Sequence, residues 1–231
     1  MKSHEGDAFE IRISGRDHVD LLHRVASNEV RGLAVGARNE QCLLSAKGKI
    51  IVPFALRREN DHVLISGPLE LKRTVLETLD RYIFTEDVLL EPLPDVQRES
   101  DNDERIEAGR PKWGVDIDED TIPWEAGMGE YVSTSKGCYT GQETIARIET
   151  YGQVARRLMR LTCAAQQPPA IGEVFREGKP VGRITSITSI PRGGLFRAIG
   201  MIRREVAEGE NVTGEDGREW TATTESSDAH K

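Results

Sequence analysis

The chain has 231 residues, of which 30% are charged and 37% hydrophobic, and its formal net charge is −8. This length is enough for one large domain or two modest ones, each with a buried core. The acidic balance disfavours broad electrostatic binding to nucleic acid. The first ten residues are polar and no apolar stretch is long enough to cross a bilayer, so neither export nor a membrane partner is expected.

The cysteine and histidine content limits the possible metal and redox chemistry. The cysteines Cys42, Cys138 and Cys163 are odd in number and widely spaced, which fits neither a disulfide framework nor a CxxC pair. A reduced, cytoplasmic setting is therefore expected. The histidines are scattered, so we expect no metal site, and we interpret His18 and His23 as surface or edge residues.

The first part of the chain alternates between strand and helix patterns. Residues 9–13 alternate like a half-buried strand, and residues 17–30 place apolar side chains on one helical face. Further strands are expected at 42–45, 49–56, 62–66 and 85–91, with a helix at 69–82. The order strand, helix, strand, strand, helix, strand is typical of a split βαβ, ferredoxin-like arrangement with antiparallel hairpins.

The middle of the chain is less regular. Residues 92–105 contain two prolines and several acids, which predicts a linker or mobile loop, with an ordered surface loop as the alternative. A short helical turn is expected at 104–109. Trp113 and Trp124 lie in the loops that follow, where they either line a pocket for a flat heterocycle or simply pack in the core.

The last part of the chain carries short strand patterns separated by glycine-containing turns. Strands are expected at 157–163, 173–176, 180–187, 196–202 and 218–223. Short strands with such turns favour a small closed β barrel. We therefore predict a first domain over 1–151, a barrel domain over 152–224 and a disordered polar tail over 225–231.

The stretch Lys136-Gly137-Cys138-Tyr139-Thr140-Gly141-Gln142-Glu143 is the most informative part of the sequence. Two glycines flank the thiol and indicate a bend, and a helix is expected at 142–150. A nearby lysine and a helix amino terminus both favour a thiolate, which would make Cys138 reactive. The alternative is a small cysteine buried in a tight turn.

Other patterns around this stretch are less specific. Arg147, Arg156, Arg157 and Arg160 form the densest basic cluster, which is either a solvated face or a site for an anionic ligand such as a carboxylate tail. The sequence has neither a GxGxxG nor a GK[ST] phosphate-binding motif. It also shows no obvious histidine base for a cysteine nucleophile.

Together with Glu125-Ala126-Gly127, the motif at 136–143 resembles the signature of the YgfZ proteins. These are folate-binding relatives of the glycine cleavage T-protein that assist iron–sulfur cluster assembly or repair. Similarity extends over most of residues 8–223 and includes the GxDI element at 114–117 and the Thr185-Ser186 pair. The resemblance implies an α+β fold, with a ferredoxin-like amino-terminal part of the T-protein type and a carboxy-terminal β barrel.

The resemblance also implies a ligand and a set of site residues. Tetrahydrofolate or a derivative would bind to the first domain, and the carboxylate of Glu125 would accept hydrogen bonds from the pterin. Trp124 or Tyr139 would pack on the rings, and Arg147 would meet the glutamate tail. The cofactor-binding set implied by the resemblance is Glu125, Trp124, Tyr139, Gln142, Glu143 and Arg147.

The implied functional thiol is Cys138, assisted by Lys136, and the implied partners are iron–sulfur enzymes or assembly factors. One thiol does not hold an ordinary four-ligand cluster permanently. The early catalytic aspartate of the T-proteins has no counterpart that we can place, so an accessory protein is favoured over a classical enzyme. The enzymatic alternative is an aminomethyltransferase that moves a one-carbon unit to tetrahydrofolate, and a third reading is a folate-independent scaffold.

Overall fold

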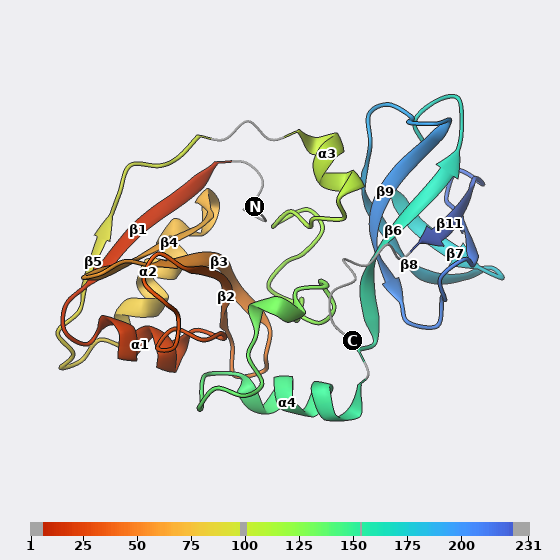
Figure 1. Ribbon diagram of the computed structural model, residues 1–231. Coiled ribbons are helices and arrows are strands. Elements are labelled where there is room, and N and C mark those ends of the chain that lie inside the picture. Colours follow the sequence, from red (N-terminus) through yellow and green to blue (C-terminus); the bar gives the residue numbers. More distant parts are fainter. Residues whose placement is uncertain (1–6, 98–100, 153, 224–231) are drawn as a thin grey trace. The chain divides into compact units, whose positions relative to one another are not determined.

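The computed structural model describes residues 7–97, 101–152 and 154–223 (Figure 1). These residues form two compact units. Unit 1 contains 7–97, 119–123 and 128–152, and unit 2 contains 101–118, 124–127 and 154–223. Unit 2 therefore includes two segments that precede position 152, where the sequence predicts the barrel domain to begin.

Unit 1 is built on a five-stranded antiparallel sheet with the order β2-β3-β4-β1-β5 (Figure 1). The apolar side chains of Phe9, Ile11 and Ile13 alternate along β1 and are all fully buried, as the period of a half-buried strand requires. Helix α1 contacts β4, and helix α2 contacts β3. The elements are β1 (Ala8–Ser14), α1 (His18–Val25), β2 (Arg38–Leu44), β3 (Ile50–Arg58), β4 (His62–Pro68), η1 (Leu69–Leu71), α2 (Lys72–Asp80), β5 (Leu89–Pro92), η2 (Gly129–Tyr131) and α4 (Gln142–Tyr151).

The strand order identifies the ferredoxin-like arrangement. Because each neighbouring pair is antiparallel, β3 runs parallel to β1 with β4 between them, and β5 runs parallel to β4 with β1 between them. These are two interleaved split βαβ units. Three strands lie between the helices, as the strands predicted at 42–45, 49–56 and 62–66 indicate. The predicted order counted one strand too few, and the additional strand β2 forms an edge of the sheet.

Helix α1 is shorter than the predicted helix at 17–30. It ends at Val25, and Ala26 is already extended, with φ −84° and ψ 156°. Beyond it the backbone joins strand β2, since Ala26 pairs with Leu43 and the amide of Ser27 donates to the carbonyl of Cys42 over 2.9 Å. The apolar periodicity continues past Val25, but pairing with a strand replaces the helix.

His23 is buried, so the surface alternative of its interpretation was wrong, and it lies at an edge of the core. Its Nδ1 lies 3.2 Å from Oε1 of Glu29. The buried side of α1 faces the core through Leu21, Leu22 and Val25, and His23 follows Leu22 at the edge of this face. Desolvation lowers the pKa of His23, and the nearby Lys136 ammonium acts in the same direction.

Two further stretches of unit 1 differ from the sequence prediction. Strand β5 begins at Leu89 rather than at residue 85, because the carboxylate of Glu86 accepts hydrogen bonds from the amides of Phe84 and Thr85 and holds a turn there. At 92–105 the sequence predicts a linker or mobile loop, with an ordered surface loop as the alternative. Val96 exchanges two backbone hydrogen bonds with Ala8, each 2.9 Å long, which favours the ordered alternative for this part.

Unit 2 contains a closed six-stranded barrel with the order β10-β11-β6-β9-β8-β7, in which β10 pairs with β7 to close the sheet (Figure 1). Trp220 is fully buried in its core, together with Leu161, Val174 and Ile202. The predicted α+β class with a small closed barrel is confirmed. The elements are α3 (Asn102–Glu107), β6 (Arg156–Ala164), β7 (Gly172–Arg176), β8 (Lys179–Ile187), β9 (Leu195–Arg203), β10 (Asn211–Gly214) and β11 (Glu219–Thr223).

The barrel contains a strand that the sequence did not predict. Strand β10 has four residues and only Val212 as a large apolar side chain, so its own pattern is too short to indicate a strand. The predicted helical turn at 104–109 corresponds to α3, which begins earlier, at Asn102, because the side chain of Asp101 caps it. The tail predicted at 225–231 lies outside the described residues.

Candidate functional site

The motif at 136–143 spans a loop of unit 1 and the start of α4. Within the loop, Cys138 is exposed, whereas Cys42 and Cys163 are buried; all three are free cysteines. The alternative of a thiol buried in a tight turn is therefore excluded. Burial raises the pKa of both the Cys42 and the Cys163 thiol, which makes these two cysteines poor nucleophiles.

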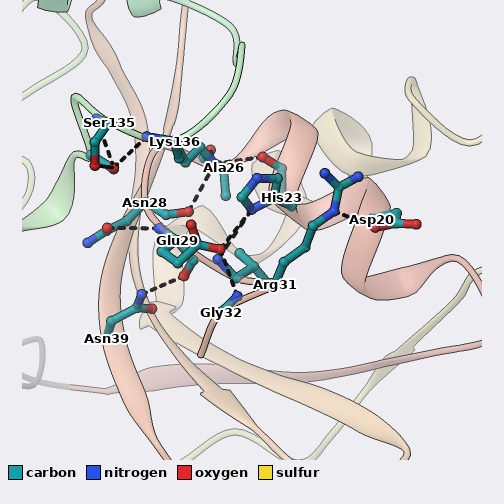
Figure 2. Close-up of polar contacts among 12 residues, drawn as sticks. Asp20, His23, Ala26, Asn28, Glu29, Arg31, Gly32, Asn39, Ser135 and Lys136 are labelled. Atoms are coloured by element: carbon teal, nitrogen blue, oxygen red, sulfur yellow. Dashed lines mark hydrogen bonds and ion pairs between the residues drawn. The ribbon is translucent and has the colours of Figure 1, made fainter. Parts of the chain in front are cut away.

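Lys136 is buried, and its side chain points away from solvent toward the end of helix α1. Figure 2 shows the Lys136 ammonium at the carbonyl groups of His23, Ala26 and Asn28. The distances from Nζ to these oxygens are 2.6, 2.5 and 2.9 Å. Burial lowers the pKa of Lys136 to about 8, against the opposite effect of the Glu29 carboxylate. The ammonium hydrogens are thus directed at backbone oxygens.

Tyr139 and Thr140 also make contacts inside unit 1. Tyr139 is buried, and its hydroxyl donates to the carbonyl of Ser133 over 3.0 Å. Its ring centroid lies 4.9 Å from the Lys136 ammonium, a cation–π contact. Burial raises the pKa of Tyr139 to about 12. The hydroxyl groups of Thr140 and Tyr82 lie 3.2 Å apart. Tyr139 thus stabilises the loop internally, and Thr140 joins it to Tyr82, just after the end of α2.

Gly141 lets the loop approach the turn between β2 and β3. It has φ 85°, and a β-carbon at this position would lie 2.6 Å from the carbonyl oxygen of Ser45. Both the positive φ and the close approach exclude a side chain. The glycine of the turn, Gly48, similarly faces Thr144, 3.0 Å from where its β-carbon would be. The motif and the hairpin at 44–49 are therefore packed against each other.

Three of the predicted ligand-binding residues lie on α4. Glu143 and Arg147 are exposed, and Gln142 is partly buried. The side-chain amide of Gln142 donates to the carbonyl of Lys136 at the long distance of 3.5 Å. This helix begins at Gln142, and its N-cap residue, Gly141, has no side chain to cap it.

Glu125 and Trp124 belong to unit 2. Glu125 is buried, with Oε1 at 3.2 Å from Nε of Arg156, and its carbonyl accepts the amide of Leu158 over 2.6 Å. Among the described residues, the buried indole Nε1 of Trp124 has no hydrogen-bond partner. A buried donor without a partner is uncommon in folded proteins. Such a donor and a buried carboxylate, here on consecutive residues, are both groups that bond polar heterocycles.

The predicted basic cluster is divided between the units. Arg147 lies on α4 in unit 1, and the other three arginines lie on β6 in unit 2. Within unit 2, Arg157 donates to the carbonyl of Val206 and Arg160 to that of Glu107. Some of the guanidinium hydrogens of these two arginines are therefore bonded inside unit 2.

The Gly114-Ile117 element and the Thr185-Ser186 pair, both noted in the sequence, meet in unit 2. The buried carboxylate of Asp116 accepts hydrogen bonds from Thr185 Oγ1 and Ser186 Oγ, at 2.5 and 2.6 Å. It also pairs with the guanidinium of Arg105, which is 2% exposed. Sequence reasoning missed Arg105, because a lone arginine among acids on a short helix gives no signal of burial.

The described residues contain no group of three or more side chains suited to hold a metal ion. No helix in the part of the chain that the structure describes is long and apolar enough to span a bilayer.

Comparison with known proteins gives a consistent picture. No family model matches the sequence. The aminomethyltransferase of Thermotoga neapolitana is 32% identical over 109 residues, which are 47% of this chain and 29% of that protein. The tRNA-modifying protein YgfZ of Yersinia enterocolitica is 41% identical over 70 residues, 29% of this chain and 21% of that protein. The matched stretches thus span less than a third of these curated relatives.

Among solved structures, the glycine cleavage system aminomethyltransferase T from Bartonella henselae matches with a TM-score of 0.82. The match covers 97% of this chain and 87% of that one, at 16% identity. At this identity the likeness shows the fold alone, which is that of the T-protein. The sequence and structure matches together confirm the resemblance to the YgfZ and T-protein relatives.

Proposed function

We propose that the protein binds tetrahydrofolate or a derivative and supports iron–sulfur cluster assembly or repair, with Cys138 as its functional thiol. The observation that carries the proposal is the exposed thiol of Cys138 between residues that have contacts inside unit 1, namely Lys136, Tyr139 and Gly141. A loop that is held in place by its own residues while its thiol stays in solvent is expected where the thiol binds to or reacts with another protein. The likeness to a YgfZ protein supports the resemblance from which this role is inferred.

The folate part of the proposal rests on Glu125 and Trp124. The Glu125 carboxylate is buried beside Arg156, and it would accept hydrogen bonds from the amino group and ring N–H of a pterin. The indole N–H of Trp124 lacks a partner among the described residues and would donate to a ring acceptor. Trp124 suits ring packing better than Tyr139, whose hydroxyl is bonded to Ser133.

The remaining predicted ligand contacts lie on α4. This helix belongs to unit 1, whereas Glu125 and Trp124 belong to unit 2. The proposed recognition of the pterin therefore rests on the unit 2 pair, and Arg147, Gln142 and Glu143 stay predicted contacts.

In this role an iron–sulfur cluster is cargo that the protein helps to transfer, and not a resident cofactor. Cys138 would supply one thiolate ligand while a cluster is held by a client enzyme or an assembly factor, since an ordinary cluster needs about four protein ligands. A reduced compartment such as the cytoplasm suits a protein with three free cysteines.

Folate binding is tested by fluorescence and thermal shift. All three tryptophans, Trp113, Trp124 and Trp220, lie in unit 2. Tetrahydrofolate should quench their fluorescence saturably and raise the melting temperature of the wild type and of Cys138→Ala. Glu125→Ala should lose both effects, whereas Glu219→Gln, an exposed glutamate on β11, should keep them. A wild-type protein that shows neither effect would refute folate binding.

The thiol is tested in cells that lack the protein. Activity of iron–sulfur enzymes should be restored by the wild type and by Cys163→Ala, which removes a buried thiol of the barrel, but not by Cys138→Ala. Full restoration by Cys138→Ala would refute the thiol role and leave folate binding intact.

The second candidate is an aminomethyltransferase, favoured by the likeness to the Thermotoga neapolitana enzyme. In that reaction the C–S bond of a carrier-bound aminomethyl group breaks, the carbon bridges two nitrogens of tetrahydrofolate, and ammonia and the carrier thiol are released. Purified protein would then form methylenetetrahydrofolate from the aminomethylated carrier, and Cys138→Ala would retain this rate. Such a result would replace the accessory role.

A further inference from the structure

The end of helix α1 in unit 1 requires hydrogen-bond donors from elsewhere. The last carbonyl groups of a helix have no partner within the helix. At this end the amide of Ala26 donates to Leu22 over 2.9 Å, and the carbonyl of His23 lies in the last turn. The chain then turns toward β2, which leaves the carbonyls of Ala26 and Asn28 near the same point.

Lys136 brings a charged donor to this point from more than a hundred residues along the chain. Its ammonium donates to the carbonyls of His23, Ala26 and Asn28 (Figure 2), and the residue is only 7% exposed. A cation at a helix carboxy terminus also interacts favourably with the helix dipole. Lys136 therefore caps α1 and, through its own backbone, connects that helix to the loop that carries Cys138.

The charged groups around the ammonium are few. The Glu29 carboxylate favours the protonated form, and the Arg31 guanidinium disfavours it. His23 titrates beside it, and the Tyr139 ring lies below it. His23 lies on α1, Glu29 and Arg31 follow that helix, and Tyr139 belongs to the motif. All of these surroundings of the ammonium therefore lie within unit 1.

A second set of contacts ties the same two segments together. The amide of Ser133 donates to the carbonyl of Ser27 over 2.9 Å, and the hydroxyl of Ser27 donates to the carbonyl of Tyr131 over 2.5 Å. The loop at 133–141 is thus held at its start by backbone contacts and at Lys136 by the ammonium.

We propose that Lys136 is a positioning residue, which holds the loop at 133–141 against the end of α1 so that Cys138 projects from a fixed backbone. This assigns Lys136 a different role from the thiolate activation that its place in the sequence indicates, because its hydrogens are directed at backbone carbonyls. The inference rests on the proposed function only for the reason why the thiol needs a fixed position.

The test uses a nitroxide spin label on Cys138, the exposed thiol, with one label expected per chain because Cys42 and Cys163 are buried. In the wild type the label should give an immobilised spectrum. Lys136→Met keeps the length of the side chain but removes the charge and the donors, so the immobilised component should be lost. Lys136→Arg should restore part of it, since a guanidinium also donates to several acceptors.

The matched control is Lys47→Met, which removes an exposed lysine from the neighbouring β2–β3 turn and should leave the immobilised component unchanged. A folded Lys136→Met protein with the wild-type spectrum would overturn the proposal. Equal mobility in Lys136→Met and Lys47→Met would also overturn it, because the effect would then come from net charge.

If Lys136→Met does not fold, hydrogen exchange on the wild type decides. The amides of Ala26, Ser133 and Lys136 are each hydrogen-bonded, and a tied loop and helix end should open together with one free energy. If the helix end and the loop open with different free energies, the proposed connection through Lys136 is refuted. Neither measurement involves folate or iron–sulfur enzymes, so failure of the proposed function and failure of this inference are distinguishable.

Discussion

The loop at 133–141 in unit 1 and the turn at 114–117 in unit 2 both belong to the resemblance, but their reactive groups have opposite surroundings. In unit 2, the Asp116 carboxylate is buried and accepts hydrogen bonds from Arg105, Thr185 and Ser186. In unit 1, Cys138 is exposed, and the residues around it make the internal contacts. The turn at 114–117 holds unit 2 together, whereas the loop at 133–141 presents the Cys138 thiol to solvent.

This difference shows how to separate structural from functional residues within a recognised motif. A carboxylate whose lone pairs are all occupied by buried donors stabilises the fold and has little capacity left for a ligand. A thiol in solvent, on a loop held by its neighbours, remains available for chemistry. Motif membership alone does not distinguish the two cases.

The largest effect on stability is expected from removal of the carboxylate of Asp116. Asp116→Ala leaves the buried guanidinium of Arg105 without its carboxylate partner, which should cost about 3–5 kcal/mol of unfolding free energy. Urea unfolding followed by tryptophan fluorescence measures this in unit 2, where all three tryptophans lie. Arg192→Met, which removes a more exposed pair with Glu107, should cost less than about 1 kcal/mol. Equal costs would contradict a stabilising network at Asp116.

The packing of the Cys138 loop is tested next by adding a methyl group. Gly141→Ala places a β-carbon 2.6 Å from the Ser45 carbonyl at a positive φ, and should destabilise unit 1 by about 1–3 kcal/mol. Far-UV circular dichroism during denaturation measures the change. Gly137→Ala is the control, since nothing lies within 4 Å of its β-carbon. Similar stability of the two variants would show that the hairpin does not constrain the loop.

The buried ammonium gives a smaller, pH-dependent effect. Burial lowers the pKa of Lys136 from 10.5 to about 8, so between these values the unfolded chain keeps a proton that the folded chain has lost. Stability therefore rises with pH in this window, on the order of 1–2 kcal/mol, since the backbone carbonyls at the ammonium offset part of its desolvation.

The measurement is the unfolding free energy of the wild type minus that of Lys136→Met, from pH 7 to pH 10.5. The subtraction removes the opposing effect of Cys42, whose raised pKa destabilises the fold at alkaline pH in both proteins. A difference that does not change with pH would contradict the lowered pKa.

The smallest effect is expected at Glu86, an accessible carboxylate that contrasts with Asp116. The amide of Phe84 and then the guanidinium of Arg24 hold the pKa of Glu86 down to about 2. Stability from this group is present above pH 4.5 and is lost as the pH falls toward 2. Glu86→Gln should flatten the acid slope of the melting temperature slightly. A slope identical to that of the wild type would refute this contribution.

Local patterns predicted much of the fold. The period of two in residues 9–13 and in the barrel strands comes from alternating burial across a sheet, so it can be recognised without a structure. The motif at 136–143 likewise indicated a bend with a thiol ahead of a helix, and the structure has both. Folate binding and the roles of the site residues stay predictions.

What the sequence by itself determined is the kind of most elements and the place of the thiol, because side-chain period and glycine positions are local properties. The tertiary structure decided where α1 ends, which carbonyls Lys136 binds and that Arg105 pairs with Asp116. The Lys136 bonds join residues 108 to 113 positions apart, and Ser186 lies 70 positions from Asp116. Local periodicity carries no record of such partners, since a buried polar group is paired only when the chain is folded.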